Sequence, residues 1–478
     1  MKVTEQPHLF KKSLTLIDST AIVIGSMIGS GIFIVSADMS RILGSPGWLL
    51  VAWIVTGILT LAAALSYGEL ASMMPKAGGQ YVYLREAYNP LSGFLYGWTL
   101  FLVIQTGTIA AVGMAFAKFM GVLFPWFSEQ HVLFDLGFFK VNSVQFLSIV
   151  SIALLTWNNM RGISAGKWVQ NIFTFLKVFV LIGFVVLGLL LARNADAIAI
   201  NHINFWNPVS STGTSLAGWA LIAAIGTAMV GSLFSADAWN NITFTAGEVI
   251  NPKKNIPLSL FLGTGLVIIL YIFANIVYLQ TLPLRGMPDA ASVFERGIQY
   301  ATNDRLGTAA MSGLFGESAA IFMAVFIVIS TFGCNNGLIL AGARVYYAMA
   351  KDGLFFRNVG KLNGKDVPAN GLMIQGVWAS LLCLTGRYSD LLDYVIFAVL
   401  IFYVLTIAGI FILRRKRPDA ERPYKAFGYP VVPALYIIIA ILIMIILLIY
   451  KPDYTWPGLI IVVLGIPVFY LWKKDQKM

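Results

Sequence analysis

The sequence has little charge and few of the residues that build catalytic or metal sites. Only 12% of its 478 residues are charged, about half the fraction usual in a soluble globular domain, and 58% are apolar. The three histidines, His8, His131 and His202, are widely separated, and no HExxH, GxSxG or Walker-type motif is present. We therefore expect no enzyme, no catalytic residue, no metal and no cofactor.

Cysteine is also scarce, which excludes a framework of disulfide bonds. The two cysteines, Cys334 and Cys383, both lie within long apolar blocks, where we expect them to pack rather than pair. A short apolar core followed by a small-residue cleavage site is missing near the N-terminus, so we expect the first apolar block to stay in the protein.

Long apolar blocks dominate the chain. Roughly twelve have 18 or more residues with few charges, which is about the length that an α-helix needs to cross the ~30 Å hydrocarbon core of a bilayer. The sequence therefore predicts an all-α polytopic membrane protein embedded in the lipid bilayer. We expect spans near residues 17–43, 47–73, 90–124, 142–159, 167–193, 216–247, 257–282, 317–350, 369–386, 389–413, 431–450 and 454–472, loops at 76–89 and 352–367, and short interfacial helices within the outside loop 282–316.

The net charge of +11 could indicate nucleic-acid binding, but the position of the basic residues argues against it. Most Lys and Arg residues fall in the loops of one side when the N-terminus is placed in the cytoplasm, as the positive-inside rule requires. Basic clusters occur at Lys11–Lys12, Lys253–Lys254, 414–417 and Lys473–Lys474. We interpret them as topology signals of a multi-pass protein of the cell membrane with both termini cytoplasmic, and expect no nucleic acid as partner.

An internal match suggests two related halves. Residues 25–30 (GSMIGS) lie in the first predicted span and residues 231–236 (GSLFSA) lie in the sixth. Because five spans separate them, the second half must be inverted, an arrangement that many secondary transporters use. We expect a core within residues 1–430, with repeats near 17–193 and 216–413, and two further helices and a short tail in 431–478.

The first of these segments predicts a broken helix. Gly25, Gly29 and Gly31 fall within seven residues at mid-span, and glycine tolerates unusual backbone angles. Close helix packing through small residues is the alternative. A break would leave N–H donors near Ser30, which suit a carboxylate, and carbonyl acceptors near Met27, which suit an ammonium group. With the matching carbonyls of Phe234, Ser235 and Asp237 in the sixth span, these groups describe the backbone of an α-amino acid.

Six stretches carry a resemblance to a known family. They are GSMIGSGIF (25–33), PKAGGQYVYLREAY (75–88), VQNIFTFLK (169–177), FSADAWNN with GEVINPKKNIP (234–257), ARVYYAMAKDG (343–353) and RPYKAFGYPVVP (422–433). Through them the chain resembles the amino acid–polyamine–organocation transporter superfamily, and most closely bacterial relatives of the L-type amino acid transporters.

The resemblance implies inverted five-helix repeats with broken helices one and six and the substrate held at the breaks. The carboxylate would meet the N–H groups of Ser30 and Gly31, and the amine would meet the carbonyls of Met27 and of the sixth span. The resemblance makes Phe234 a gate over the substrate; packing against lipid or protein is its other interpretation.

Lys177 is the most informative single charge, because an ammonium about ten residues into an apolar span is costly. Snorkelling to the membrane surface is the alternative, but it is strained over roughly 15 Å. The resemblance places Lys177 where sodium-coupled relatives bind a cation, tying spans one, five and eight together. We therefore expect transport without sodium, with proton coupling left open.

Asp237 departs from the small or aromatic residue expected at this place in the family. Three roles stay open: attracting a basic side chain, contacting the substrate amine, or pairing with a neighbouring amide such as Asn240. Candidates for a side-chain pocket are Thr106, Gly107, Phe234, Trp239 and Ser330. The charged residues Glu69, Glu248, Arg344 and Asp352 are expected near cytoplasmic span ends, either as pairs that close the inward side or as charges that fix helix depth.

The predicted function is alternating-access transport of L-amino acids, neutral ones first, by sodium-independent exchange. Alternatives are an antiporter or proton symporter of cationic amino acids or polyamines, motivated by Asp237, and a transporter-like nutrient sensor. Animal L-type transporters bear a cysteine in the loop after span three, which links them to a partner, but residues 125–141 contain none. We therefore expect no disulfide-linked ancillary subunit, and a monomer or homodimer.

Overall fold

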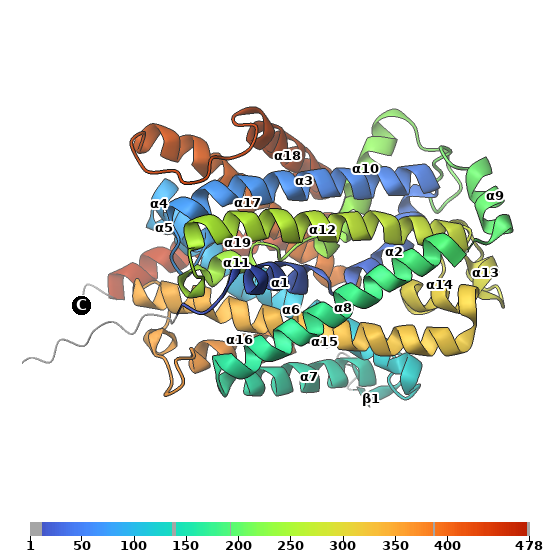
Figure 1. The fold of residues 1–478 in the computed structure, drawn as a ribbon, viewed down its shortest axis with the longest axis horizontal. Helices are drawn as coiled ribbons and strands as arrows, with labels where there is room; N and C mark the ends of the chain where they lie inside the picture. The colour runs from blue at the N-terminus through green and yellow to red at the C-terminus, as the bar shows by residue number, and fades with distance from the viewer. Residues whose placement is uncertain (1–11, 136–139, 192, 386–387, 476–478) are drawn as a thin grey trace, which may run out of the picture.

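The computed structural model describes residues 12–135, 140–191, 193–385 and 388–475, and of 163–170 and 473–475 it describes only the backbone. Long helices lie side by side along one axis (Figure 1). The first half of the chain contains α1 (Leu16–Met27), η1 (Gly31–Phe33), α2 (Val35–Leu43), α3 (Pro46–Met73), α4 (Gln80–Ala87), α5 (Pro90–Thr99), η2 (Leu100–Ile104), α6 (Gln105–Leu123), β1 (Val132–Asp135), β2 (Lys140–Asn142), α7 (Ser143–Met160), α8 (Ile163–Leu191) and α9 (Ala195–Ile203).

The second half repeats the pattern of long helices joined by short ones. It contains α10 (Gly218–Ser235), α11 (Asn241–Phe244), η3 (Ala246–Glu248), α12 (Pro252–Thr281), α13 (Val293–Arg296), η4 (Thr302–Asp304), α14 (Leu306–Phe315), α15 (Glu317–Lys351), η5 (Arg357–Gly360), α16 (Ala369–Leu382), α17 (Tyr388–Lys416), α18 (Val431–Tyr450) and α19 (Pro452–Asp475).

The expectation of an all-α membrane protein is confirmed. Among the described residues, ten helices are long and apolar enough to cross a membrane, where the sequence suggested about twelve. The other two expected spans coincide with α7 and α16. At 1.5 Å per residue α16 is only ~21 Å long, shorter than the hydrocarbon core, and the polar Ser, Thr and Asn residues of α7 lower its hydropathy.

Local signals explain where many helices begin. Pro46, Pro90 and Pro252 occupy the first turn of their helices, where the missing N–H group costs nothing. Helix α1 starts with a capping box in which Thr15 and Asp18 exchange side-chain and backbone hydrogen bonds. The loop expected at 76–89 is wrong in part, because α4 forms within it, and α9 was not expected; α13 and α14 supply the short helices expected in 282–316.

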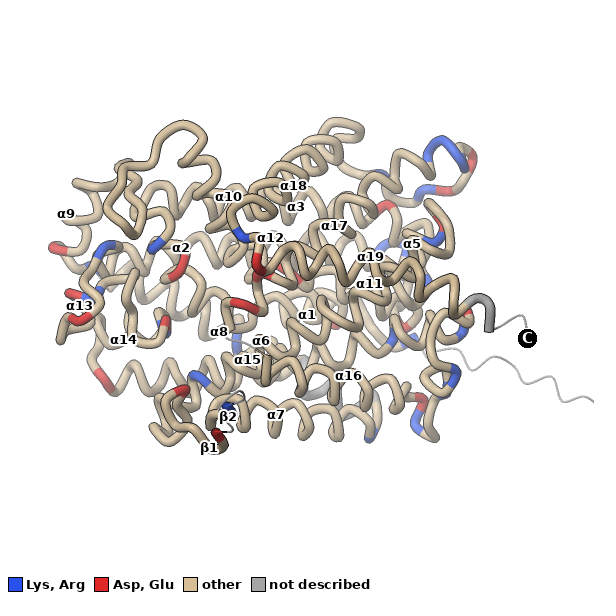
Figure 2. The backbone as a smooth tube through the Cα atoms, turned by 180° about the vertical axis from the view of Figure 1, so that it is seen from behind, with Lys and Arg blue, Asp and Glu red and all other residues tan. Residues whose placement is uncertain are grey.

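The charged residues gather at the two ends of the bundle and leave its middle mostly uncharged (Figure 2). One end, called the α4 end here, carries α4, the C-terminal end of α17 and residues 417–430. The other, the α9 end, carries α9, α13 and α14. Of the basic clusters, Lys11 and the side chains of Lys473–Lys474 lie outside the described part of the chain.

Candidate functional site

The first break separates α1 from α2. Helix α1 ends at Met27, Ile28 is extended at φ −74° and ψ 92°, and a single turn, η1, precedes α2. Within the described residues, the N–H groups of Ser30 and Gly31 donate no backbone hydrogen bond. Two donors therefore face away from the helix at mid-membrane, where such groups are tolerable only when they line a polar space.

Lys177 of α8 braces this break. Its ammonium donates to the carbonyls of Gly25 at 2.5 Å and Ile28 at 2.9 Å, and its side chain is fully buried. Ser330 of α15 reaches the same Ile28 carbonyl at 3.5 Å. The structure thus brings the first, fifth and eighth predicted spans together at Lys177. It places Ser330 beside the break instead of in a side-chain pocket.

The other carbonyls of the break also have partners. The Met27 carbonyl accepts a hydrogen bond from the Tyr271 hydroxyl at 2.9 Å, and the Ser26 carbonyl lies 3.2 Å from the Cys334 thiol. Met27 therefore offers a substrate only its remaining lone pair, because a carbonyl oxygen has two. The sequence predicted the acceptor but not Tyr271, which lies 244 positions away.

The second break follows α10, which ends at Ser235, and α11 begins only at Asn241. Ala238 adopts the left-handed region at φ 65°, which a residue with a Cβ seldom does. Asp237 is buried and accepts a hydrogen bond from the Tyr403 hydroxyl at 2.5 Å. Asn240 is not its partner, because the Asn240 amide donates to Gln80 at 3.1 Å.

The two breaks touch each other at Gly31. A Cβ atom placed on Gly31 would collide with the side chain and Cα of Ser235, so only glycine allows this approach. A central cavity of about 20 Å³ lies at this contact. Its lining contains all six residues predicted to bind the substrate backbone: Met27, Ser30, Gly31, Phe234, Ser235 and Asp237.

Phe234 lies between this cavity and a larger one. Its ring packs edge-on against Tyr388 with the ring centroids 6.1 Å apart, and the Tyr388 hydroxyl lies 3.0 Å from that of Ser30. Tyr388 also lines a vestibule of about 390 Å³ at the α9 end. Two aromatic rings therefore separate the vestibule from the central cavity, which is the position expected of a gate.

The vestibule is strongly charged. Arg41 binds Asp304 at 2.7 Å and Lys451 binds Asp393 at 2.9 Å across it. Its other charged lining residues are Asp38, Lys118, Glu129 and Asp390. Carboxylates and ammonium or guanidinium groups face the same volume, which suits the passage of a zwitterion.

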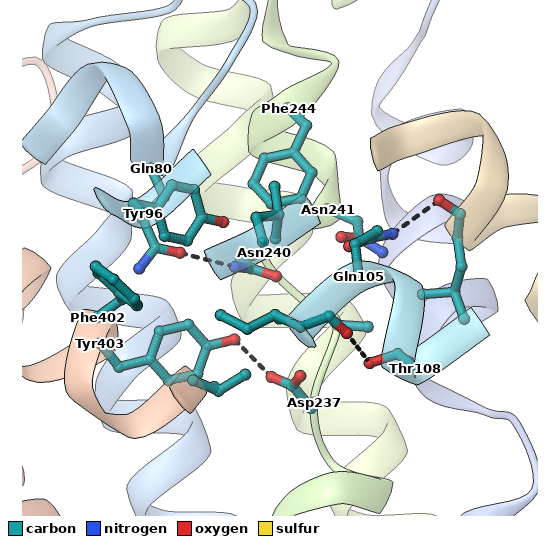
Figure 3. A pocket seen from close by; sticks show the side chains of 15 residues that line it. Gln80, Tyr96, Gln105, Thr108, Asp237, Asn240, Asn241, Phe244, Phe402 and Tyr403 are labelled. Carbon is teal, nitrogen blue, oxygen red and sulfur yellow. Dashed lines mark hydrogen bonds between the residues drawn. The ribbon is translucent and has the colours of Figure 1, made fainter. Parts of the chain in front are cut away.

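A second small cavity, called the polar cavity here, lies beyond Asp237 (Figure 3). It measures about 20 Å³. Its polar lining comes from α4, α5, α6, α17 and the α10 break: Gln80, Tyr96, Gln105, Thr108, Asp237, Asn240, Asn241 and Tyr403. Among these, the sequence indicated Asp237 and, as its possible partner, Asn240. Gln80, Tyr96, Gln105, Thr108 and Tyr403 become their neighbours only through the packing of helices that are distant in the sequence.

The remaining pocket candidates lie close to these cavities but not in them. The Thr106 hydroxyl donates to the Phe101 carbonyl at 2.6 Å, and Gly107 faces Val395. Their neighbours Gln105 and Thr108 line the polar cavity instead, because the π-helical turn η2 shifts the face that α6 presents. Trp239 packs against Tyr67 and lines a third small cavity with Asp237.

Ion pairs join the helices at the α4 end. Glu248 binds Arg344 at 2.5 Å with both side chains buried, and Glu69 binds Arg414 at 2.7 Å. These pairs link α15 to the segment after the α10 break, and α3 to α17. The four residues named from the sequence, Glu69, Glu248, Arg344 and Asp352, therefore all lie at this end, and the first three form ion pairs there.

Helix α4 carries further contacts of this kind. Asp352 accepts from both Tyr81 and Arg85. Burial, and then the nearby Asp352 carboxylate, raise the pKa of Tyr81. A hydrogen bond from Arg417 lowers the pKa of Glu86 below its ordinary value. The pair of Glu86 and Arg417 is therefore charged throughout the neutral pH range.

Comparison with known proteins identifies the family. The model of the amino acid permease family matches residues 14–469. The small subunit 2 of a large neutral amino acids transporter of Mus musculus is 29% identical over 475 residues, 98% of this chain and 82% of the relative. The human form is 28% identical over the same shares. A b(0,+)-type amino acid transporter 1 of Mus musculus is 27% identical over 465 residues, 96% of this chain and 87% of the relative. The chain belongs to the amino acid permease family of the amino acid–polyamine–organocation superfamily, and it is a membrane transporter of amino acids, not an enzyme.

Proposed function

We propose that the protein exchanges neutral L-amino acids across a cell membrane without sodium, by alternating access, with its α4 end in the cytoplasm. The observation that carries the proposal is the central cavity, where the breaks of α1 and α10 meet at Gly31 and Ser235. The family match and relatives named for large neutral amino acids support the substrate class.

Backbone groups supply the binding energy for the part that all amino acids share. The N–H groups of Ser30 and Gly31 receive the carboxylate, at the start of the helical turn that leads into α2, where the helix dipole favours negative charge. The ammonium meets the carbonyls of Ser235 and Asp237, with the remaining capacity of the Met27 and Phe234 carbonyls. Such contacts do not depend on the side chain of the substrate, so they fit a carrier of several amino acids.

Lys177 supports the absence of sodium coupling. Its ammonium already bonds the Gly25 and Ile28 carbonyls, the kind of oxygen ligands that a sodium ion would take. A cation that is covalently part of the protein cannot travel with the substrate. The break of α1 is then held in shape in every step of transport, and the gradient of the substrates themselves drives exchange.

Alternating access follows from the two ends of the molecule. The vestibule leads from the α9 end to the ring pair of Phe234 and Tyr388, while ion pairs join the helices at the α4 end. We propose that residues 17–193 and 216–413 form the inverted repeats whose relative motion exchanges these states. The basic clusters support a cytoplasmic position for the α4 end and for both termini.

Transport of cationic amino acids is the second candidate, and Asp237 favours it. Among the described residues its carboxylate bonds the neutral Tyr403, with no Lys or Arg recorded in a salt bridge to it. A basic substrate side chain would supply the missing charge. Polyamines fit less well, because they lack the carboxylate for Ser30 and Gly31.

The assembly state stays a proposal. The mouse and human relatives are named as small subunits, so the comparisons do not support the expectation of a monomer or homodimer without a disulfide-linked ancillary subunit. We propose that any such contact is noncovalent. Both cysteines of the chain are buried free thiols, and residues 125–141 contain none.

Exchange in proteoliposomes tests this function. Purified protein is reconstituted with unlabelled amino acids inside, and uptake of single labelled amino acids and putrescine is followed with and without sodium and a pH gradient. Sodium-independent uptake of leucine that rises with internal leucine supports the exchanger. Uptake confined to arginine, lysine or putrescine supports the second candidate, and binding with no uptake indicates a sensor.

A further inference from the structure

The lining of the polar cavity includes a buried amide donor that the protein leaves unused. The Asn241 side chain is 1% exposed, and its Nδ2 atom has no partner. The other carboxamides of the cavity are engaged: Gln80 donates to Thr406 at 3.0 Å and Gln105 to the Leu338 carbonyl at 2.7 Å. A buried amide without a partner is costly, so its retention points to a group that binds there in another step of the cycle.

An acceptor faces the same space. Asp237 lines the polar cavity and accepts hydrogen bonds from the Tyr403 hydroxyl (Figure 3) and from the backbone N–H of Ala238. A carboxylate has about four lone-pair positions, so roughly half of its acceptor capacity remains. The cavity therefore presents an unused amide donor, Asn241, and an under-used acceptor, Asp237.

The polar cavity adjoins the proposed substrate site. Four residues line both the polar and the central cavities: Thr108, Asp237, Ala238 and Leu338. A side chain that starts at the central cavity and passes Asp237 enters the polar cavity. Its volume of about 20 Å³ has room for roughly one water molecule, so it fits the polar end of a side chain and not a bulky one.

We propose that Asn241 and Asp237 make the polar cavity a subsite that selects substrates whose side chain ends in both an acceptor and a donor, which is a carboxamide such as that of glutamine. The carboxamide oxygen accepts from Asn241 Nδ2, and its NH2 group donates to Asp237. The inference rests on the proposed function, since it assumes that an amino acid occupies the central cavity.

Other side chains satisfy the subsite less completely. An apolar side chain leaves both polar groups unpaired, which is how a hydrogen-bonding site rejects analogues. A lysine side chain pairs with Asp237 but offers no acceptor to Asn241. A glutamate side chain brings a second negative charge next to Asp237, which a medium of low dielectric constant strongly disfavours.

The first test uses the wild-type protein in proteoliposomes and needs no variant. Norleucine resembles glutamine in length but has no polar atoms in its side chain. We expect kcat/KM for glutamine to exceed that for norleucine by about tenfold, the effect of about one net hydrogen bond. Equal values would overturn the inference while leaving amino acid transport intact. Failure to take up either would overturn the proposed function, and the inference with it.

The second test assigns the selectivity to Asn241. The glutamine-to-norleucine ratio of kcat/KM should fall about tenfold in Asn241→Ala and in the near-isosteric Asn241→Asp, which lacks the amide donor. Asn336→Ala is the matched control, because Asn336 Nδ2 is also buried without a partner but lies in α15 away from the polar cavity. A ratio that stays unchanged in the Asn241 variants, or falls equally in Asn336→Ala, would overturn the assignment.

Discussion

The breaks in α1 and α10 interrupt two membrane helices in the same way but satisfy the freed backbone differently. At the α1 break, side chains of α8, α12 and α15 reach successive carbonyls from Gly25 to Ile28. The donors are Lys177, Tyr271 and Cys334. This break is braced from three sides, and its free groups are the N–H donors of the following turn.

The α10 break is held by fewer contacts, and some of its polar groups have unused hydrogen-bonding capacity. Asp237 pairs with the neutral Tyr403 hydroxyl, and the Nδ2 atom of Asn241 has no partner. The difference suggests that the two breaks have different roles. The α1 break holds the backbone groups that bind the part common to all amino acids, and the α10 break distinguishes among substrate side chains.

The contact between the breaks should be the most sensitive point. In Gly31→Ala the new Cβ would collide with Ser235, so we expect leucine uptake into proteoliposomes to fall to background. Gly183→Ala is the control, because a Cβ on Gly183 meets nothing within 4 Å. Uptake by Gly31→Ala within twofold of the wild type would show that the breaks need not touch.

Removing the brace of the α1 break should have the next largest effect. Lys177→Ala leaves the Gly25 carbonyl without its donor and the Ile28 carbonyl with only the 3.5 Å contact to Ser330. An unpaired buried polar group costs roughly 1–3 kcal/mol. We expect leucine uptake to fall about a hundredfold, while size-exclusion chromatography still shows folded protein. The exposed Lys254→Ala should behave as wild type. Unchanged kinetics in Lys177→Ala would exclude the bracing role.

Changing the α10 break should alter selectivity more than rate. In Asp237→Asn the carboxylate that pairs with a cation is lost, so the lysine-to-leucine ratio of kcat/KM should fall about tenfold. The exposed Asp419→Asn serves as control. An equal loss for both substrates would instead assign Asp237 to the amine site or to the fold.

A pair on the surface of the α4 end should matter least. The pKa of Glu86 is lowered, so its pair with Arg417 is kept at neutral pH and lost only as the pH falls through that lowered value. The side chains are 29% and 50% exposed, where ion pairs contribute little. Glu86→Gln should therefore change leucine uptake less than twofold between pH 6 and 8. A larger change would mean that this pair controls closure at the α4 end.

The helices and both breaks could be predicted because their signals are local. Apolar length located the spans, and the glycines around Gly29 together with the GSLFSA match located the breaks. Tyr271, Tyr403 and Asn241 could not be assigned roles, because nothing near them in the sequence shows that they face a broken helix. Helix α4 was missed because a short helix with a polar face resembles a loop in hydropathy.

The same limit explains the pocket residues. Thr106 and Gly107 were the pocket candidates in the third span, yet Gln105 and Thr108 line the cavity, since the π-helical turn η2 changes which face α6 presents. A one-residue error in register rotates a helical side chain by about 100°. Lys177 was recognised because a charge in an apolar span is conspicuous wherever the helix points.

A rescue experiment tests most directly whether the two breaks form one site. Ser235→Gly removes the Oγ and Cβ atoms that a Cβ on Gly31 would strike at 2.1 and 2.7 Å, so that only the contact with the Cα of residue 235, at 2.8 Å, is left to relax. Leucine exchange is measured for the wild type, Gly31→Ala, Ser235→Gly and the double variant. We predict that the double variant transports at least about tenfold faster than Gly31→Ala, because the two positions are in direct contact. A double variant as inactive as Gly31→Ala, or worse, would contradict the account.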